Sequence, residues 1–331
     1  MIISQTPLRI SFFGGGTDLK NFYNFNIGKV LSTSIDKYIY VIIKERYDDL
    51  IVLNYSKKEI VDKAPSIQHE LIREAIIRTG IKKGVEITTL SDIPSEGSGL
   101  GSSSSLLVGL LNAFYTYMGG SKDNLSLAKE ACEIEINILK KPIGKQDQYA
   151  ASFGGLKMYE FLPNEAVNVI GLNIGLKEIL DFQRHLYLVY TGITRKSSSI
   201  LEQQSNHCDD NKDLLKTMSE LTLVAKNYLE NNKFDEFGQC LNETWEIKKR
   251  LAKGITCPAI DEIYQKGIHA GALGGKLLGA GGGGFLLFYI PDHALNIFKD
   301  CFVGSYKSLP FKFTREGTKI IFNNGRNEHM I

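Results

Sequence analysis

The order of apolar and polar positions predicts both strands and helices in the first half of the chain. Apolar residues alternate with polar ones over 7–13, as in a half-buried strand, and Arg9 and Ser11 lie on its polar face. Further apolar runs are rich in β-branched and aromatic residues, which is typical of strands. The predicted elements are strands at 7–13, 38–43, 50–55 and 85–90 and helices at 106–114 and 125–139. The last helix should end before Pro142, because proline disfavours helix in the residue before it.

The second half shows the same mixture. The predicted elements are a strand at 186–190, amphipathic helices at 212–230 and 234–252, a helix that begins at Pro258, a strand at 285–290, and a hairpin of 311–314 with 319–322. Trp245 and Lys248 lie on the apolar stripe of the second helix, so we expect Trp245 in the core. Strands and helices in both halves predict an α+β fold. The pattern weakens between 161 and 182, which places a domain boundary near 180 and gives domains 1–180 and 181–331.

Composition excludes several classes of protein. The 331 residues suffice for two domains, and 39 Lys and Arg against 37 Asp and Glu leave a net charge of only +2, so neither nucleic acid nor an acidic membrane is indicated as a partner. The apolar run at 106–118 is too short to span a bilayer. The five cysteines form no CxxC pair, and the first residues do not resemble a secretory signal. We therefore expect a reduced, cytoplasmic protein without a structural metal.

A segment rich in glycine and serine carries the strongest chemical signal. It spans 94–105, follows a predicted strand and leads into a predicted helix. Glycines let backbone N–H groups approach an anion, and the start of a helix adds free donors, so the segment predicts a phosphate site. The candidate residues are Gly97, Ser98, Gly99, Leu100, Gly101, Ser102, Ser103 and Ser104. The alternative is a flexible linker, and the absence of Gly-Lys-Ser/Thr excludes a Walker A loop.

A second glycine cluster spans 279–284. It matches GxGxxG, but it precedes a strand, whereas a dinucleotide site needs it to precede a helix. We therefore reject a dinucleotide site. A backbone that must come very close to a ligand or to another loop explains the cluster, and a plain flexible turn is the alternative.

Two further segments have weaker signals. Asp147 lies between two glutamines after a helix end, where it could be a base or simply part of a surface loop. Glu133 and Glu135 on the preceding helix could bind metal or be solvated. The segment 191–198 follows a strand and carries two cations, which suits a second phosphate or an ordinary capped helix start.

Together these segments resemble the GHMP kinases, a family named for galactokinase, homoserine kinase, mevalonate kinase and phosphomevalonate kinase. The three family motifs occur here in order at 7–18, 97–105 and 276–284. The sequences FGGGTD and PIGKQDQ are most similar to the branch of the family that phosphorylates heptose 7-phosphate, and bacterial fucose kinases share similar triple glycines. Galactokinases carry Gly-Glu-His-Thr-Asp where this chain has Gly14 to Asp18, which argues against galactose.

The resemblance implies an N-terminal domain with a left-handed βαβ crossover, a ferredoxin-like C-terminal domain, and ATP with Mg²⁺ between them. It implies that Ser103 and Glu135 ligate the metal and that Asp147 is the catalytic aspartate. It further implies that Arg9 faces Asp147 and that Asp18 binds the sugar. The remaining substrate contacts are expected at Gly15, Gly16, Thr17, Thr191, Gly192, Gly281 and Gly282.

The implied reaction is ATP-dependent phosphorylation of the anomeric hydroxyl of D-glycero-D-manno-heptose 7-phosphate. Its 1,7-bisphosphate product would serve the synthesis of GDP-heptose for surface polysaccharide, and the α-anomer is implied. We expect Arg195 to hold the substrate phosphate, since arginine suits bidentate phosphate contact, with Lys196 and Lys145 as alternatives. A fucose-type sugar 1-kinase and a non-catalytic sugar sensor are the competing functions, and the intact set of Arg9, Glu135 and Asp147 argues against the sensor.

Overall fold

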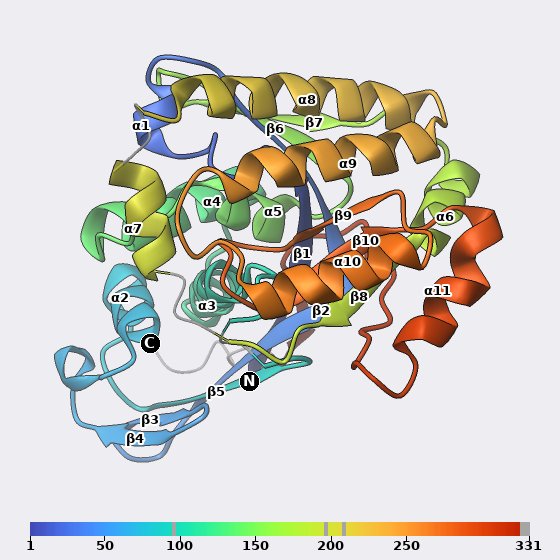
Figure 1. Ribbon diagram of the computed structural model, residues 1–331. Helices are drawn as coiled ribbons and strands as arrows, with labels where there is room; N and C mark the ends of the chain where they lie inside the picture. Colours follow the sequence, from blue (N-terminus) through green and yellow to red (C-terminus); the bar gives the residue numbers. More distant parts are fainter. Residues whose placement is uncertain (95–96, 195–197, 207–209, 325–331) are drawn as a thin grey trace.

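The computed structural model describes residues 1–94, 97–194, 198–206 and 210–324, and in this part of the chain the fold is α+β with two sheets (Figure 1). The larger, nine-stranded sheet contains β1 (Ile2–Phe13), β2 (Gly28–Glu45), β3 (Ile51–Asn54), β4 (Lys58–Val61), β5 (Val85–Ser91), β6 (Lys157–Phe161), β7 (Val167–Gly171), β11 (Phe313–Thr314) and β12 (Lys319–Asn323). The smaller sheet has the order β8 (Leu186–Tyr190), β10 (Phe285–Tyr289), β9 (Gly274–Leu277).

The helices pack on both sheets. They are α1 (Lys20–Tyr23), α2 (Glu70–Thr79), α3 (Ser102–Tyr117), α4 (Asn124–Cys132), α5 (Gln146–Phe153), α6 (Leu176–Arg184), α7 (Ser198–Asn206), α8 (Lys212–Glu230), α9 (Phe234–Lys249), α10 (Pro258–His269) and α11 (Leu295–Phe302), with short helical turns η1 (Ala64–Ser66) and η3 (Asp292–Ala294). Helices α3 and α5 contact β1 and β2, whereas α9 contacts β9 and β10. In the part of the chain that is described, no helix has both the length and the apolar character needed to cross a membrane.

The long strands β1 and β2 form the centre of the larger sheet, and they pair antiparallel along most of their length. Leu8, Ile10 and Phe12 are fully buried, as the alternation predicts. Arg9 and Ser11 on the other face are also buried, at 4% and 5% exposure. The polar face of β1 therefore does not meet solvent but forms one wall of a cavity.

Most predicted elements are confirmed, and two differ. The predicted hairpin of 311–314 with 319–322 is wrong, because β11 pairs with β2 and β12 pairs with the open edge of β1. The predicted helix at 125–139 changes geometry at Glu133: α4 ends at Cys132, and Glu133–Ile138 (η2) forms a π-helix. A π-helical turn within an α-helix often marks a functional site.

One aromatic cluster connects the two sheets. The ring of Phe12 on β1 lies 5.5 Å from that of Phe237 on α9, and Phe237 lies 4.9 Å from Phe182 on α6. Trp245 is fully buried, as expected. We keep the domain boundary near residue 180 as a proposal: α6 spans it and the smaller sheet begins after it, whereas β11 and β12 return to the larger sheet.

Candidate active site

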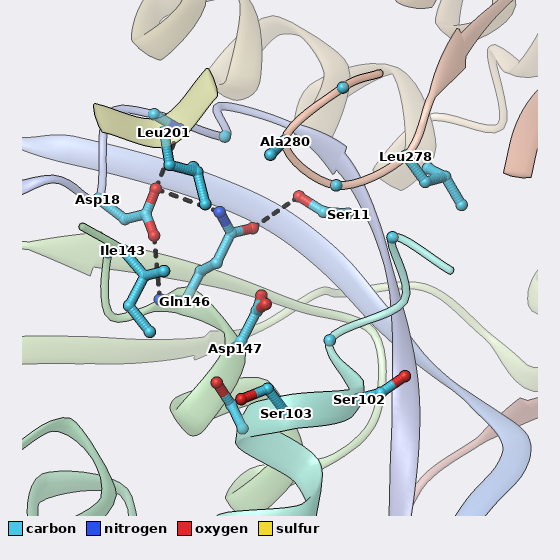
Figure 2. A pocket seen from close by; sticks show the side chains of 18 of the residues that line it. Ser11, Asp18, Ser102, Ser103, Ile143, Gln146, Asp147, Leu201, Leu278 and Ala280 are labelled. Atoms are coloured by element: carbon cyan, nitrogen blue, oxygen red, sulfur yellow. Dashed lines mark hydrogen bonds between the residues drawn. The ribbon is translucent and has the colours of Figure 1, made fainter. Parts of the chain in front are cut away.

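A cavity of about 460 Å³ lies where the two halves meet (Figure 2). Its walls come from β1, the loop before α3, the starts of α3 and α5, and the glycine loop before β10. The predicted site residues that line it are Arg9, Gly15, Gly16, Asp18, Gly97, Ser98, Gly99, Gly101, Ser102, Ser103, Ser104, Glu135, Asp147 and Gly281. Segments from both ends of the sequence thus converge on one cavity.

The loop before α3 is built to present backbone N–H groups. Gly97, Gly99 and Gly101 all have positive φ, of 70°, 74° and 79°, which glycine adopts without strain. Gly101 is the N-cap of α3 and offers no side chain to the first turn, so the donors of that turn remain for a ligand. Leu100 is fully buried and its carbonyl accepts the N–H of Arg9, so this residue anchors the loop to β1.

The two glycine-rich loops touch through their backbones. A Cβ at Gly99 would lie 2.4 Å from the carbonyl oxygen of Leu278, and one at Gly279 would lie 2.6 Å from the Cα of Gly99. Such distances exclude any side chain at either position. The close-approach interpretation of 279–284 is therefore confirmed, and the plain-turn alternative is wrong.

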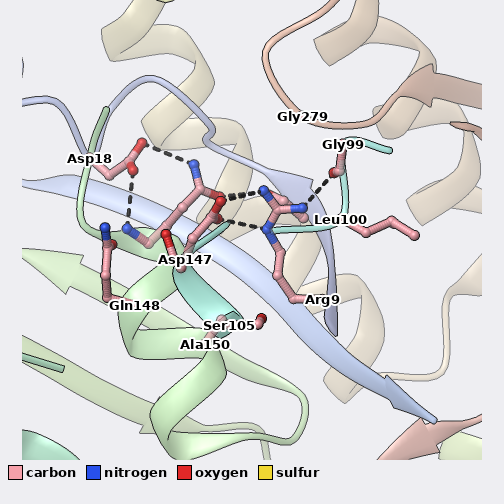
Figure 3. A network of polar contacts seen from close by, with 12 residues as sticks. Arg9, Asp18, Gly99, Leu100, Ser105, Asp147, Gln148, Ala150 and Gly279 are labelled. Atoms are coloured by element: carbon pink, nitrogen blue, oxygen red, sulfur yellow. Dashed lines mark hydrogen bonds and ion pairs between the residues drawn. The ribbon is translucent and has the colours of Figure 1, made fainter. Parts of the chain in front are cut away.

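Asp147 lies in the first turn of α5, and its side chain faces the cavity, so the surface-loop interpretation is wrong. Arg9 Nε donates to Asp147 Oδ1 at 2.7 Å and Nη2 donates to Oδ2 at 2.9 Å (Figure 3). Arg9 Nη1 also donates to the carbonyl of Gly99 at 2.6 Å. The guanidinium thereby fixes the carboxylate beside the phosphate loop with a bidentate, charge-assisted contact.

Glu135 is fully buried rather than solvated. It accepts hydrogen bonds from Ser103 Oγ at 2.8 Å, Ser104 Oγ at 2.6 Å and Gln148 Nε2 at 2.7 Å. The π-helical turn Glu133–Ile138 carries it, and Glu133 remains exposed. A buried carboxylate requires such partners, because leaving a charge unsatisfied in the interior is costly.

The donor set at Ser103 and Glu135 fits Mg²⁺. Their oxygens lie 2.8 Å apart, close to the ~2.9 Å between neighbouring ligands of an octahedral ion with bonds of about 2.1 Å. Mg²⁺ is usually held by one or two protein oxygens together with substrate phosphates, and Ser103 and Glu135 offer two such oxygens beside the phosphate loop. Lys141 Nζ lies 3.6 Å from Glu135 Oε1 and 3.1 Å from Glu70 Oε1 at the same end of the cavity.

Asp18 and Gln146 form the opposite end of the cavity. The Asp18 carboxylate accepts the N–H of Gly16 at 3.0 Å and both the N–H and the Nε2 of Gln146 at 3.1 Å. Burial raises the pKa of Asp18, and the two backbone donors oppose that shift. Ser11 Oγ donates to Gln146 Oε1 at 2.7 Å, which fixes the orientation of the amide. Gly144 is required here, since a Cβ would lie 2.0 Å from Asp18 Oδ2.

Some predicted residues do not line the cavity. Thr17 is fully buried and donates to the carbonyl of Gly14 at 2.8 Å. Thr191 Oγ1 donates to the carbonyl of Gly284 at 2.8 Å, which ties β8 to the glycine loop. Gly192 and Gly282 also lie outside the lining. Direct substrate contact by these four residues stays a prediction.

Of the three candidate phosphate-binding cations, Lys145 is the one that lies among the described residues, and it does not line the cavity. Arg195 and Lys196 lie outside the described residues. Lys145 pairs with Glu165 and lies 4.6 Å above the ring of Tyr23, away from the cavity.

The structure adds two lysines that the sequence analysis did not assign to the site. Lys248 on α9 and Lys276 on β9 both line the cavity and are buried, at 4% and 1% exposure. Lys248 Nζ donates to the carbonyl of Gly279 at 2.6 Å, and Lys276 Nζ donates to that of Phe12 at 2.8 Å. Burial lowers the pKa of Lys248 to about 8 and that of Lys276 well below its ordinary value. For Lys248, the sequence signal was the position of a lysine on the otherwise apolar stripe of a predicted helix.

Comparison with known proteins agrees with this arrangement. The family model "GHMP kinases N terminal domain" matches residues 53–155, and "GHMP kinases C terminal" matches residues 207–301. The D-glycero-alpha-D-manno-heptose 7-phosphate kinase of Campylobacter jejuni is 33% identical over 96% of this chain and 98% of its own. The L-fucokinase/L-fucose-1-P guanylyltransferase of Bacteroides fragilis is 28% identical over 88% of this chain but only 35% of its own.

A solved structure extends the likeness to the whole fold. The D-glycero-D-manno-heptose 1-phosphate kinase of Bacteroides thetaiotaomicron superposes with a TM-score of 0.81 and 26% sequence identity, covering 98% of this chain and 100% of that one. Two family models, a full-length relative above 30% identity and a matching fold thus agree with the three motifs that meet in the cavity. The chain belongs to the GHMP kinase family.

Proposed function

We propose that this protein transfers the γ-phosphoryl group of ATP to the anomeric hydroxyl of a heptose 7-phosphate, giving the 1,7-bisphosphate. The observation that carries the proposal is the carboxylate of Asp147, fixed by Arg9 between the phosphate loop and the Asp18 end of the cavity. The similarity to the heptose 7-phosphate kinase of Campylobacter jejuni supports this choice of acceptor. The product would serve the cytoplasmic synthesis of GDP-heptose for surface polysaccharide.

Asp147 is suited to accept the proton of the attacking hydroxyl. As the sugar oxygen bonds to the γ-phosphorus, its O–H proton passes to the Asp147 carboxylate, and the bond from phosphorus to the β,γ-bridging oxygen breaks to release ADP. Arg9 stabilises the negative charge that develops beside it, and the N–H groups at the start of α3 bind the nucleotide phosphates. Mg²⁺ would be held by Ser103 and Glu135, and its charge would partly neutralise the phosphates.

Turnover against a panel of acceptors tests the proposal. With ATP and Mg²⁺, we expect a kcat/KM for heptose 7-phosphate that exceeds those for unphosphorylated heptose, L-fucose and D-galactose. A preference for L-fucose would instead support the fucose-type kinase that the Bacteroides fragilis relative suggests. Sugar binding without turnover of any acceptor would support the sensor.

A further inference from the structure

A buried ammonium group faces the cavity without a carboxylate partner. Lys248 is 4% exposed, and among the residues that the structure describes its Nζ has a single hydrogen bond, to the carbonyl of Gly279. Within the described ranges, no carboxylate oxygen lies at ion-pair distance from this nitrogen: Asp147 pairs with Arg9, and Asp18 accepts from Gly16 and Gln146. A buried charge is costly unless it is paired. The position therefore suits an anion supplied from outside the chain.

The space beside Lys248 is open because residue 15 has no side chain. A Cβ at Gly15 would lie 3.8 Å from Lys248 Nζ, 3.6 Å from Gln146 Nε2 and 3.9 Å from Ser11 Oγ. The Lys248 ammonium and the Gln146 amide, which keeps one N–H after donating the other to Asp18, therefore border one small volume beside the Ser11 hydroxyl. N–H donors of this kind suit the oxygens of a phosphate. An acidic side chain at residue 15 would put a carboxylate there and repel such a group.

This volume lies on the acceptor side of the reacting carboxylate. Figure 2 shows Gln146 and Ser11 on one side of Asp147 and Ser103 on the other. The nucleotide phosphates and the metal belong with Ser103 and the start of α3, so a second anion beside Gln146 comes from the acceptor.

We propose that Lys248, together with Gln146 and the open space at Gly15, binds the phosphate group of the acceptor sugar, a phosphate monoester dianion. This inference rests on the proposed function and names the residues that select its class of substrate. Lys248 thus takes the phosphate-binding role for which Lys145 was a candidate, because Lys145 pairs with Glu165 whereas Lys248 lines the cavity.

The first test exchanges the charge of Lys248 for an apolar side chain of similar length. In Lys248→Met, the KM for heptose 7-phosphate should rise about 10- to 100-fold, because one charge-assisted contact is lost. The KM for ATP should change less than threefold, and the preference for heptose 7-phosphate over unphosphorylated heptose should largely disappear. Lys249→Met is the matched control, since Lys249 is the next residue on α9 and pairs with Glu246 instead.

The second test fills the space and leaves the lysine in place. Gly15 has no left-handed φ, and a Cβ there would meet nothing closer than 3.6 Å, so Gly15→Ala should fold normally. The added methyl group should still raise the KM for heptose 7-phosphate at least fivefold by excluding phosphate oxygens. Gly171→Ala, where a Cβ meets nothing within 4 Å, is the control and should behave as wild type.

The outcomes separate this inference from the proposed function. A wild-type protein that does not use heptose 7-phosphate overturns both. A wild type that prefers heptose 7-phosphate, with a Lys248→Met variant that keeps this preference and its KM, overturns the inference alone. A fall in kcat at unchanged acceptor KM would also overturn it, because Lys248 would then act on the phosphoryl group in transfer. Calorimetric titration with heptose 7-phosphate in the absence of nucleotide should show the same loss of affinity in Lys248→Met.

Discussion

At the scale of single residues, the reaction depends on the carboxylate that Arg9 fixes beside the phosphate loop. Asp147→Asn keeps the shape of the side chain but removes its ability to accept a proton. We expect kcat to fall by about 10²–10⁴-fold while the KM for ATP changes little, because a general base contributes about this factor. Steady-state kinetics with ATP and heptose 7-phosphate measure both constants.

The chain offers a matched control for this variant. Asp48 forms the same kind of bidentate pair with Arg46, at 2.8 Å between Nε and Oδ1, and does not line the cavity. Asp48→Asn should therefore leave kcat unchanged. If Asp147→Asn retained more than a tenth of wild-type kcat, Asp147 would not be the base.

Deprotonation of Lys248 should lower kcat/KM for the acceptor at alkaline pH. Burial, and then the charge of Arg9, lower its pKa from 10.5 to about 8, while Asp18 and Asp147 oppose the shift. Lys248 in turn lowers the pKa of Lys276, the other buried lysine of the cavity. The Lys248 ammonium is therefore mostly charged below about pH 8 and mostly neutral above it. Consequently kcat/KM for heptose 7-phosphate should fall as pH rises through about 8, since this parameter reports the free enzyme.

A pH series for the wild type and two variants checks this decline in kcat/KM. Lys248→Met should lack the decline near pH 8, and Lys248→Arg should shift it upward, because arginine stays charged. If kcat/KM of Lys248→Met declined near pH 8 as in the wild type, the decline would be due to the titration of another group.

At the scale of elements, local patterns were predictable and partners were not. The amphipathic helices α8 and α9 and the start of α10 at Pro258 follow from 3.6-residue spacing and from proline at a first helical position, which are local properties. The prediction of a hairpin was wrong because strand pairing is non-local. β11 pairs with β2 and β12 pairs with β1, and the two strands do not pair with each other. The inward direction of Glu135 depends on a π-helical turn that no residue pattern indicated.

The site shows the same division between local and non-local information. Asp147, Ser103 and Arg9 belong to motifs that can be recognised along the sequence, and the fold brings them together. Lys248 occupies a helix stripe that is otherwise apolar, so its role emerges only when α9 is packed against the glycine loop. Residues whose function depends on a neighbouring element are thus the ones that sequence patterns miss.

The contact between the two glycine loops can be tested by comparing two glycines of similar conformation. Gly99 has a φ of 74° and Gly80 a φ of 77°, so alanine is strained at both. Only at Gly99 would the Cβ also meet backbone, 2.4 Å from the carbonyl of Leu278. Gly99→Ala should therefore displace the phosphate loop and raise the KM for ATP at least tenfold, whereas Gly80→Ala should cost about 1 kcal/mol of stability and leave the KM for ATP unchanged.

Nucleotide titration and urea unfolding of both variants measure these effects. Equal KM values for ATP in Gly99→Ala and Gly80→Ala would show that the contact between the loops does not shape the nucleotide site.

At the scale of the whole molecule, the end of the described chain returns to the helix that carries Asp147. β12 completes the edge of the larger sheet beside β1. Just before it, the N–H of Thr318 donates to the carbonyl of Ala151 on α5, and Thr318 Oγ1 lies 2.8 Å from Thr6 Oγ1. The segment that follows the smaller sheet thus holds α5 against β1, which links both halves to the position of Asp147.

Gly317 is the point at which this link can be broken without changing a charge. Its φ is not left-handed, but a Cβ would lie 2.0 Å from the carbonyl oxygen of Ser152 near the end of α5. Gly317→Ala should therefore push the returning segment away from α5 and lower the free energy of unfolding by about 1–3 kcal/mol, as other overpacked sites do. Because α5 carries Asp147 in its first turn, kcat should fall as well, although Gly317 does not line the cavity. Gly120→Ala is the control: its Cβ would meet only the carbonyl of Tyr115 at 3.7 Å, and both stability and kcat should stay at wild-type values. Urea unfolding and steady-state kinetics of the two variants decide the matter, and a Gly317→Ala protein with wild-type stability and kcat would show that α5 keeps its place without the returning segment.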